Sequence, residues 1–270
     1  MLLAADTGGQ TAIGRTAIDQ AVLSKVSEQF GINSEVIVHL DLTQPFRTKS
    51  QWTLVVAKQP DEESAAVDGL GERKGAISFC LVEKAEPQCS EEMHGAGPFY
   101  ELFTSDIVFS GRGKTLPLLR IKTCTMGGAN GNCGVSTFLF AYDSKADRFN
   151  VVFFNILGRN NNEETRFIEN GPLLGSVIVA YPTNDPPFVY DVEVYRRAPA
   201  HEQYAAVLRY RGHTVYGDGN PLAVIDSEMP EILRRLGLWK KGEPLPIPPH
   251  MPATCKRLVL RKSVEWCEGN

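Results

Sequence analysis

Six cysteines constrain the fold of this chain more than any other feature, because they fall into three close pairs. The pairs are Cys80/Cys89, Cys124/Cys133 and Cys255/Cys267. Each pair brackets a segment that can fold back as a hairpin, and opposite residues of a hairpin have Cβ atoms close enough for a disulfide. The spacing therefore predicts three local disulfides in this order, although six cysteines permit other pairings. If the paired cysteines face each other directly, the turns are centred on Lys84-Ala85, Gly128-Ala129 and Arg261.

Disulfides indicate an oxidising compartment, so we expect a periplasmic or secreted protein. The alternatives are free buried thiols or zinc ligands, but zinc-binding cysteines normally lie about two to four residues apart, and no such spacing occurs. The stretch Met1 to Ala5 is compatible with the remnant of a removed signal peptide. Whether the precursor is a lipoprotein stays open.

The segment from Leu116 to Phe154 predicts a β-meander, since it holds the longest apolar runs rich in branched and aromatic residues. We expect strands at 118–121, 135–142 and 149–154, with a polar turn at 143–148. Further strands are expected at 36–42, 52–57 and 76–82. A helix beginning near Thr16 is expected before them, with a stripe formed by Ile18, Val22, Val26 and Phe30 that packs on the sheet.

A weak internal repeat suggests that the meander occurs twice. Strand, aromatic strand, polar turn and aromatic strand follow one another at 118–152 and again at 177–208. This order resembles blades of the FG-GAP or VCBS type of β-propeller. The predicted fold is mainly β with two peripheral helices, its antiparallel meanders forming an incomplete or small propeller-like array or a β-sandwich. We expect a flexible N-terminus at 1–14, a helix plus antiparallel β domain at 15–213, and a C-terminal part at 214–270 packed on that domain.

The C-terminal part begins at Gly217 to Pro221, a run of turn-forming residues. Asp226-Ser227 is expected to cap a second helix, which ends at Gly237 in a Schellman motif. A segment with four prolines, 243–249, should then wrap the surface before the last hairpin. The apolar positions of this second helix are Met229, Ile232, Leu233 and Leu236.

The stretch from Tyr204 to Pro249 resembles an uncharacterised family of exported proteobacterial proteins. The resemblance rests on the run Tyr216 to Leu222 and on the run Asp226 to Pro230. It implies export and no particular activity.

Two groups of polar residues are candidate binding loops. Asp218, Asn220, Asp226 and Glu228 are oxygen donors that a glycine-rich turn could fold around calcium, although turns and helix caps explain them equally well. Asn160, Asn161, Asn162 and Arg166 form a polar loop beside aromatic strands that could bind a glycan. By contrast, Gly111 to Thr115 lacks the first glycine of a phosphate-binding loop, because Val108 stands at that position.

Charge and hydropathy exclude several functional classes. With 28 basic and 32 acidic residues mixed along the chain, there is no basic field for nucleic acid. No apolar run is long enough to span a membrane, and no local catalytic motif involves a histidine. We therefore predict a non-catalytic binding or interaction protein of the cell envelope, whose partner is a protein or a glycan and which needs no cofactor except possible calcium. The alternative is a hydrolase of envelope glycans that uses Asp218, Asp226 or Glu228.

Overall fold

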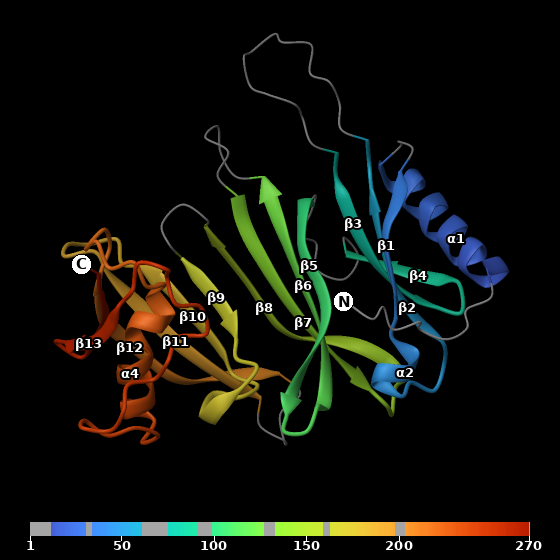
Figure 1. Ribbon diagram of the computed structural model, residues 1–270. Coiled ribbons are helices and arrows are strands. Elements are labelled where there is room, and N and C mark those ends of the chain that lie inside the picture. The colour runs from blue at the N-terminus through green and yellow to red at the C-terminus, as the bar shows by residue number, and fades with distance from the viewer. Residues whose placement is uncertain are drawn as a thin grey trace, which may run out of the picture. The chain divides into compact units, whose positions relative to one another are not determined.

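The computed structural model describes residues 12–30, 34–60, 75–90, 99–126, 133–158, 163–197 and 203–269 (Figure 1). These residues form a mainly β protein with antiparallel sheets, as predicted. Three α-helices are seen in the described ranges, one more than expected: α1 (Ala12–Phe30), the single turn α2 (Thr43–Phe46) and α4 (Val224–Arg235). A short 3-10 helix, η1, spans Gly171–Leu173.

The strands form three sheets. The first has the order β1-β2-β3-β5-β6-β7-β8, with β4 paired to β3, the second has the order β12-β11-β10-β9, and the third is the hairpin β13-β14. Within the described ranges, none of the sheets closes on itself. The bounds are β1 Glu35–Asp41, β2 Trp52–Lys58, β3 Ile77–Glu83, β4 Glu86–Cys89, β5 Phe99–Gly111, β6 Thr115–Met126, β7 Cys133–Asp143, β8 Arg148–Gly158, β9 Glu164–Phe167, β10 Val177–Pro182, β11 Val189–Arg197, β12 Tyr204–Val215, β13 Arg257–Arg261 and β14 Val264–Glu268.

The chain divides into two compact units. The first comprises Met1–Phe103 and Tyr142–Asn150, and the second comprises Thr104–Ala141 and Val151–Asn270. The predicted C-terminal part, 214–270, therefore belongs to the same unit as β9 to β12.

In the first unit, helix α1 packs on the sheet through the predicted stripe. Ile18, Val22 and Val26 are buried against Val55 of β2 and Val82 of β3. The helix begins at Ala12, so Thr16 lies inside it and the predicted start near Thr16 is wrong. Residues 1–11 of the expected flexible terminus lie outside the described residues.

All three predicted disulfides are present, so the pairing by proximity is confirmed. Cys80 directly faces Cys89, and the turn falls on Lys84 and Ala85, which both have positive φ. Three disulfides indicate an oxidising compartment.

The register predicted for the other two pairs is wrong. Cys124 faces Val135 rather than Cys133, so the second disulfide joins diagonal neighbours across β6 and β7. In the third pair, Cys267 faces Leu258, and the turn lies at 262–263 rather than at Arg261. The Cα atoms of Cys124 and Cys133 nevertheless lie 5.5 Å apart, within the range of disulfides. Close spacing therefore predicts the partner without fixing the register. The expected turn centre at 128–129 lies outside the described residues.

In the second unit, the four-stranded sheet is covered on both faces (Figure 1). Val177 and Val179 of β10 face one way and pack with Leu118, Leu139 and other side chains of β6, β7 and β8. Ile178 and Ala180 face the other way and pack with α4. The repeat predicted at 118–152 and 177–208 corresponds to the meanders β6-β7-β8 and β10-β11-β12. In this unit the two meanders pack through a shared apolar layer.

Helix α4 docks by the face that the sequence indicates. Ile232 and Leu233 are buried, and Met229 and Leu236 pack beside them. Its end is the predicted Schellman motif, because Gly237 has positive φ and the Leu238 amide donates to the Leu233 carbonyl at 2.8 Å. None of the helices in the described part of the chain is both long and apolar enough to cross a membrane.

Candidate functional site

The turn residues Asp218 and Asn220 connect three parts of the second unit. The Asp218 carboxylate is exposed and accepts a hydrogen bond from the Asn220 amide at 2.8 Å. The Asn220 side chain donates to the Ser227 hydroxyl at 3.0 Å and to the Glu265 carbonyl at 2.9 Å. It also accepts a bond from the Cys267 amide at 3.3 Å. Asn220 therefore holds the turn, α4 and the final hairpin together.

Glu228 is buried among donors that surround its carboxylate. Its Oε1 accepts bonds from the amides of His213 and Thr214 at 2.7 and 2.6 Å, and from the Thr214 hydroxyl at 2.7 Å. Its Oε2 accepts a bond from the Tyr210 hydroxyl at 3.0 Å, and burial together with the Glu228 charge raises the pKa of that phenol. A side chain at Gly212 would lie 2.8 Å from Oε1, so the approach requires glycine there. These contacts attach α4 to β12.

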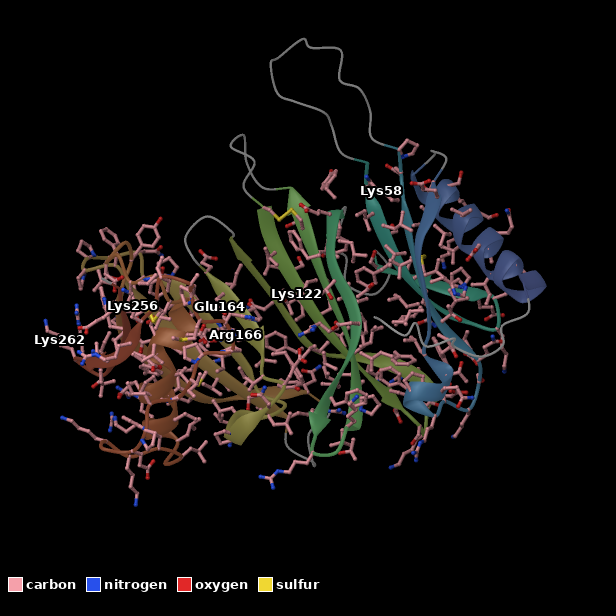
Figure 2. All side chains as sticks on the ribbon, in the orientation of Figure 1. Lys58, Lys122, Glu164, Arg166, Lys256 and Lys262 are labelled. Carbon is pink, nitrogen blue, oxygen red and sulfur yellow. A yellow bond between two sulfur atoms is a disulfide. The ribbon has the colours of Figure 1, made fainter. Side chains whose placement is uncertain are left out.

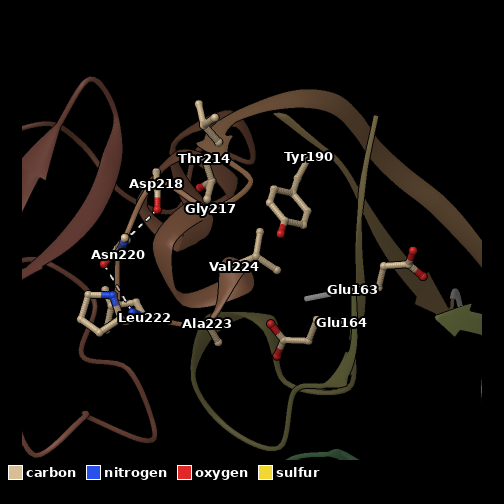
Figure 3. A pocket seen from close by; sticks show the side chains of 13 residues that line it. Glu163, Glu164, Tyr190, Thr214, Gly217, Asp218, Asn220, Leu222, Ala223 and Val224 are labelled. Atoms are coloured by element: carbon tan, nitrogen blue, oxygen red, sulfur yellow. Dashed lines mark hydrogen bonds between the residues drawn. The ribbon is translucent and has the colours of Figure 1, made fainter. Parts of the chain in front are cut away.

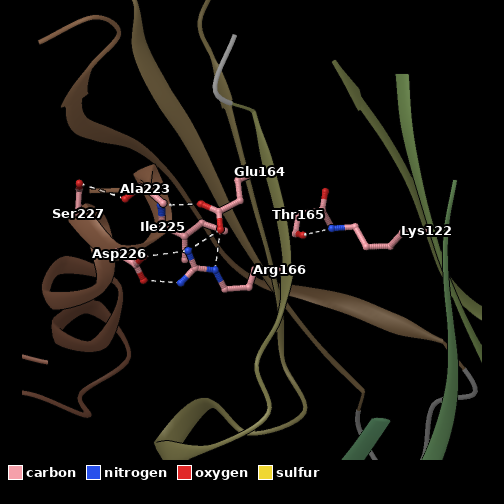
Figure 4. A network of polar contacts seen from close by, with 8 residues as sticks. All are labelled: Lys122, Glu164, Thr165, Arg166, Ala223, Ile225, Asp226 and Ser227. Carbon is pink, nitrogen blue, oxygen red and sulfur yellow. Dashed lines mark hydrogen bonds and ion pairs between the residues drawn. The ribbon is translucent and has the colours of Figure 1, made fainter. Parts of the chain in front are cut away.

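Asp226 and Ser227 do not cap α4, which corrects the prediction. The helix begins at Val224, so both residues lie in its first turn. Ser227 donates back to the Ala223 carbonyl at 3.2 Å. A carboxylate from another element supplies a bond at this end instead: Glu164 of β9 accepts from the Ile225 amide at 3.2 Å (Figure 4).

Glu164, Arg166 and Asp226 form a largely buried ion network between β9 and α4 (Figure 4). Arg166 donates to Glu164 at 2.6 Å and holds both oxygens of Asp226, of which one contact measures 3.1 Å. Burial lowers the pKa of Arg166, but its bonds to Asp226 and Glu164 outweigh that and raise it. For Glu164, burial raises the pKa more than Arg166 lowers it. The network fixes the helix on the edge strand.

The predicted glycan loop is not assembled around Arg166. Asn160, Asn161 and Asn162 lie outside the described residues, and the Arg166 guanidinium is engaged by two carboxylates. Likewise, the four predicted oxygen donors at 218–228 do not converge, because Asp226 and Glu228 bond to different partners. Among the described residues, no group of three or more His, Cys, Asp or Glu side chains could hold a metal ion.

Two recesses flank β9, and both are lined by residues of the second unit alone. The turn pocket, of about 600 Å³, is lined by Glu163, Glu164, Tyr190 and residues 214–215 and 217–224 (Figure 3). The larger recess, of about 750 Å³, follows residues 164–173 and is called the β9 cleft. Its other walls come from β6, β7, α4 and the proline-rich segment.

The β9 cleft is amphipathic. Its lining includes the polar side chains of Arg120, Lys122 and Thr137 and the apolar side chains of Met229 and Ile247. Arg120 is fully paired, because it donates to both oxygens of Asp106 at 2.9 and 2.6 Å and to Glu169 at 3.0 Å. Figure 2 shows Lys122 on β6 and Glu164 and Arg166 on β9.

Sequence reasoning missed Lys122 and Glu164. Arg120 and Lys122 alternate with Leu119 and Ile121, a pattern that a strand with one solvent-exposed face also shows. The structure adds that the second sheet covers the face that carries Lys122. Charged residues at such positions face a polar recess or an ion partner. No sequence signal marks Glu164, because its partner amide lies 61 residues away.

No known protein family matches this chain, and no characterised protein or solved structure shows significant similarity to it.

Proposed function

We propose that this protein is a non-catalytic binding protein of the periplasm or of the secreted fraction, and that the β9 cleft is its ligand site. The observation that carries the proposal is the cleft itself: a recess of about 750 Å³ lined by both charged and apolar side chains. Pockets of this size and mixed lining are typical of small-molecule sites. Three disulfides support an oxidising location.

The state of the carboxylates favours binding over hydrolysis. A glycan hydrolase needs two carboxyl groups free to exchange protons or attack the sugar. Asp226 is held by Arg166, and Glu228 accepts four hydrogen bonds from fixed donors. Of the three proposed acids, Asp218 alone is exposed, and it lines the turn pocket rather than the β9 cleft.

The test is hydrogen exchange with mass spectrometry on the full chain, with and without small glycans and amphiphiles. The probes are muropeptides, chitooligosaccharides, dodecanoate and dodecyl maltoside. We expect one of them to slow exchange in β9 and in the proline-rich segment and to be recovered unchanged. Protection confined to other surfaces would refute the cleft. Conversion of a probe that is lost in Asp218→Asn would show instead that the protein is a hydrolase.

A further inference from the structure

Lys122 is the cation of the β9 cleft that lacks a counterion. Its ammonium donates one hydrogen bond, to the carbonyl of Thr165 at 3.4 Å (Figure 4). Among the residues that the structure describes, no carboxylate lies within 4.0 Å of it. An ammonium has three donors, so at least two are unused by the described residues. The arginines of the cleft differ, since each holds two carboxylates.

Thr137 adds a second unused polar group beside Lys122. The two residues face each other across β6 and β7, which brings their Cβ atoms within about 5.5 Å. Thr137 is 4% exposed, and its hydroxyl has no hydrogen-bond partner among the described residues. An unpaired buried hydroxyl is unfavourable in the free protein. Both residues line the cleft, so an unpaired cation and an unpaired hydroxyl lie next to each other in its lining.

The part of the cleft on the α4 side of β9 is aliphatic (Figure 4). Met229 and Leu233 of α4 and Ile247 of the proline-rich segment line it, and Ile247 is 82% exposed. Trp239 also lines it but is 8% exposed, and its indole N–H donates to the Pro244 carbonyl at 3.0 Å. Sugars are usually stacked on an open aromatic face, and this wall offers branched and linear alkyl groups instead. Such a wall suits an alkyl chain.

We propose that the β9 cleft binds an amphipathic anion. Its carboxylate or phosphate head lies at Lys122 and Thr137, and its alkyl chain lies against Met229 and Ile247. The inference rests on the proposed function, because it takes the cleft as the ligand site, and it adds the chemical class of the ligand. The head supplies the missing counterion, and the chain covers an apolar side chain that the free protein leaves in water.

The electrostatics of Lys122 agree with this arrangement. Burial lowers the pKa of its ammonium and the positive charge of Arg120 lowers it further, while the charge of Glu164 only partly opposes this shift. An anion beside Lys122 favours the charged form, so binding raises this pKa.

The test is isothermal titration calorimetry of the full chain with three ligands that share a twelve-carbon chain. Dodecanoate carries a carboxylate, dodecyl phosphate carries a phosphate, and dodecyl maltoside is neutral; all are used below their micelle-forming concentrations. We expect both anions to bind at least tenfold more tightly than the maltoside. The stronger of the two anions then identifies the head group. Equal binding of all three ligands would overturn the proposal.

Substitutions locate the head group. Lys122→Met keeps the length of the side chain and removes its charge, so it should weaken anion binding about 10- to 100-fold. Lys262→Met, on an exposed turn residue outside the cleft, is the matched control and should leave affinity unchanged. Equal affinities of the two variants would refute the role of Lys122.

Thr137→Val tests whether the Thr137 hydroxyl contacts the ligand, because a hydroxyl with only a structural role would change stability without changing affinity. The substitution should stabilise the free protein, because an unpaired hydroxyl is removed, and weaken anion binding about 3- to 10-fold. Unchanged affinity would exclude Thr137 from the site.

Substitutions on the apolar wall locate the chain. Ile247→Ser should weaken dodecanoate binding about 3- to 10-fold, because the chain loses an apolar contact. Val207→Ser, at another exposed branched residue outside the cleft, should not. If the two substitutions had the same effect, the chain would not lie along this wall.

Failure of this inference is distinguishable from failure of the proposed function. If a muropeptide or the maltoside slows exchange in β9 while neither anion binds, the cleft is a ligand site of another class and the inference is wrong. If no probe protects the cleft, both are wrong.

Discussion

Glu265 of β14 gives the sharpest prediction about stability, because its carboxyl group is buried without a partner. The residue is 0% exposed, and neither side-chain oxygen has a hydrogen-bond partner among the described residues. Burial, with a contribution from the charge of Asp226, raises its pKa from 4.5 to about 7. The protonated form is thus favoured in the folded protein.

The sign of the pH dependence follows from this shift. Between pH 4.5 and about 7 the folded protein keeps a proton on Glu265 that the unfolded chain releases. The free energy of unfolding therefore falls as the pH rises through this window. A shift of this size corresponds to about 3 kcal/mol, which is lost in full above about pH 7.

Glu265→Gln removes the titratable carboxyl group and keeps the size and shape of the side chain. Its free energy of unfolding should match that of the wild type near pH 4.5 and exceed it by about 3 kcal/mol at pH 8.5. The assay is urea denaturation from pH 4.5 to 8.5 with the disulfides intact. A difference between the two proteins that does not change with pH would refute the reasoning.

Glu268→Gln, on the same strand, is the matched control with the opposite sign. Arg261 and Arg257 hold the pKa of Glu268 below its ordinary value. Its contribution to stability is therefore present at neutral pH and lost as the solution becomes acidic. This variant should be less stable than the wild type at neutral pH and equal to it in acid.

Three further predictions concern the fold. Leu233→Ala should lower the free energy of unfolding by about 2–5 kcal/mol, because Leu233 is packed in the core. Ser227→Ala should lower it by only about 1 kcal/mol, because it removes only side-chain hydrogen bonds. Urea denaturation of both variants compares the two effects. Millimolar calcium should leave the melting temperature unchanged, because Asp226 and Glu228 already have partners; a rise that disappears in Asp218→Ala would reveal a metal site. Replacing Cys124 and Cys133 by Ser should lower the free energy of unfolding by about 2–3 kcal/mol, and peptide mapping without reductant should recover the three disulfides; links between different pairs would contradict the assignment.

Local patterns predicted those parts of the fold whose determinants lie close together in the sequence. The disulfide partners, the buried stripe of α1 and the Schellman end of α4 each depend on residues within about four turns of a helix or one hairpin. The registers of the second and third cysteine pairs could not be predicted from spacing alone. Cys124 and Cys133 are offset by two positions across β6 and β7, and Cys255 lies outside β13 altogether.

The candidate site was hidden for the opposite reason. The sequence indicates that Arg166 is a loop residue, because three asparagines precede it. Its partner Asp226 lies 60 residues away, so no local pattern links the two residues. The sequence predicts Asp226 to be a helix cap because aspartate is favoured at that position before a helix. No residue close to it in the sequence indicates that an arginine binds it. Lys122 becomes a candidate only when the second sheet is seen to cover its strand.

The bond between Glu164 and the Ile225 amide also makes the start of α4 depend on β9. Ala223 offers no side-chain acceptor at its start, and Pro230 removes a backbone donor from its middle. A peptide covering 217–238 should therefore be mostly unstructured in water. The amide of Ile225 becomes protected from exchange only when β9 is in place, so its exchange rate reports the pairing of that edge strand. A circular permutant opened at 198–202 keeps β9 and α4 in one chain but reverses their order. If α4 still forms in this permutant, it requires the contact with β9 but not the native order of the two elements along the chain.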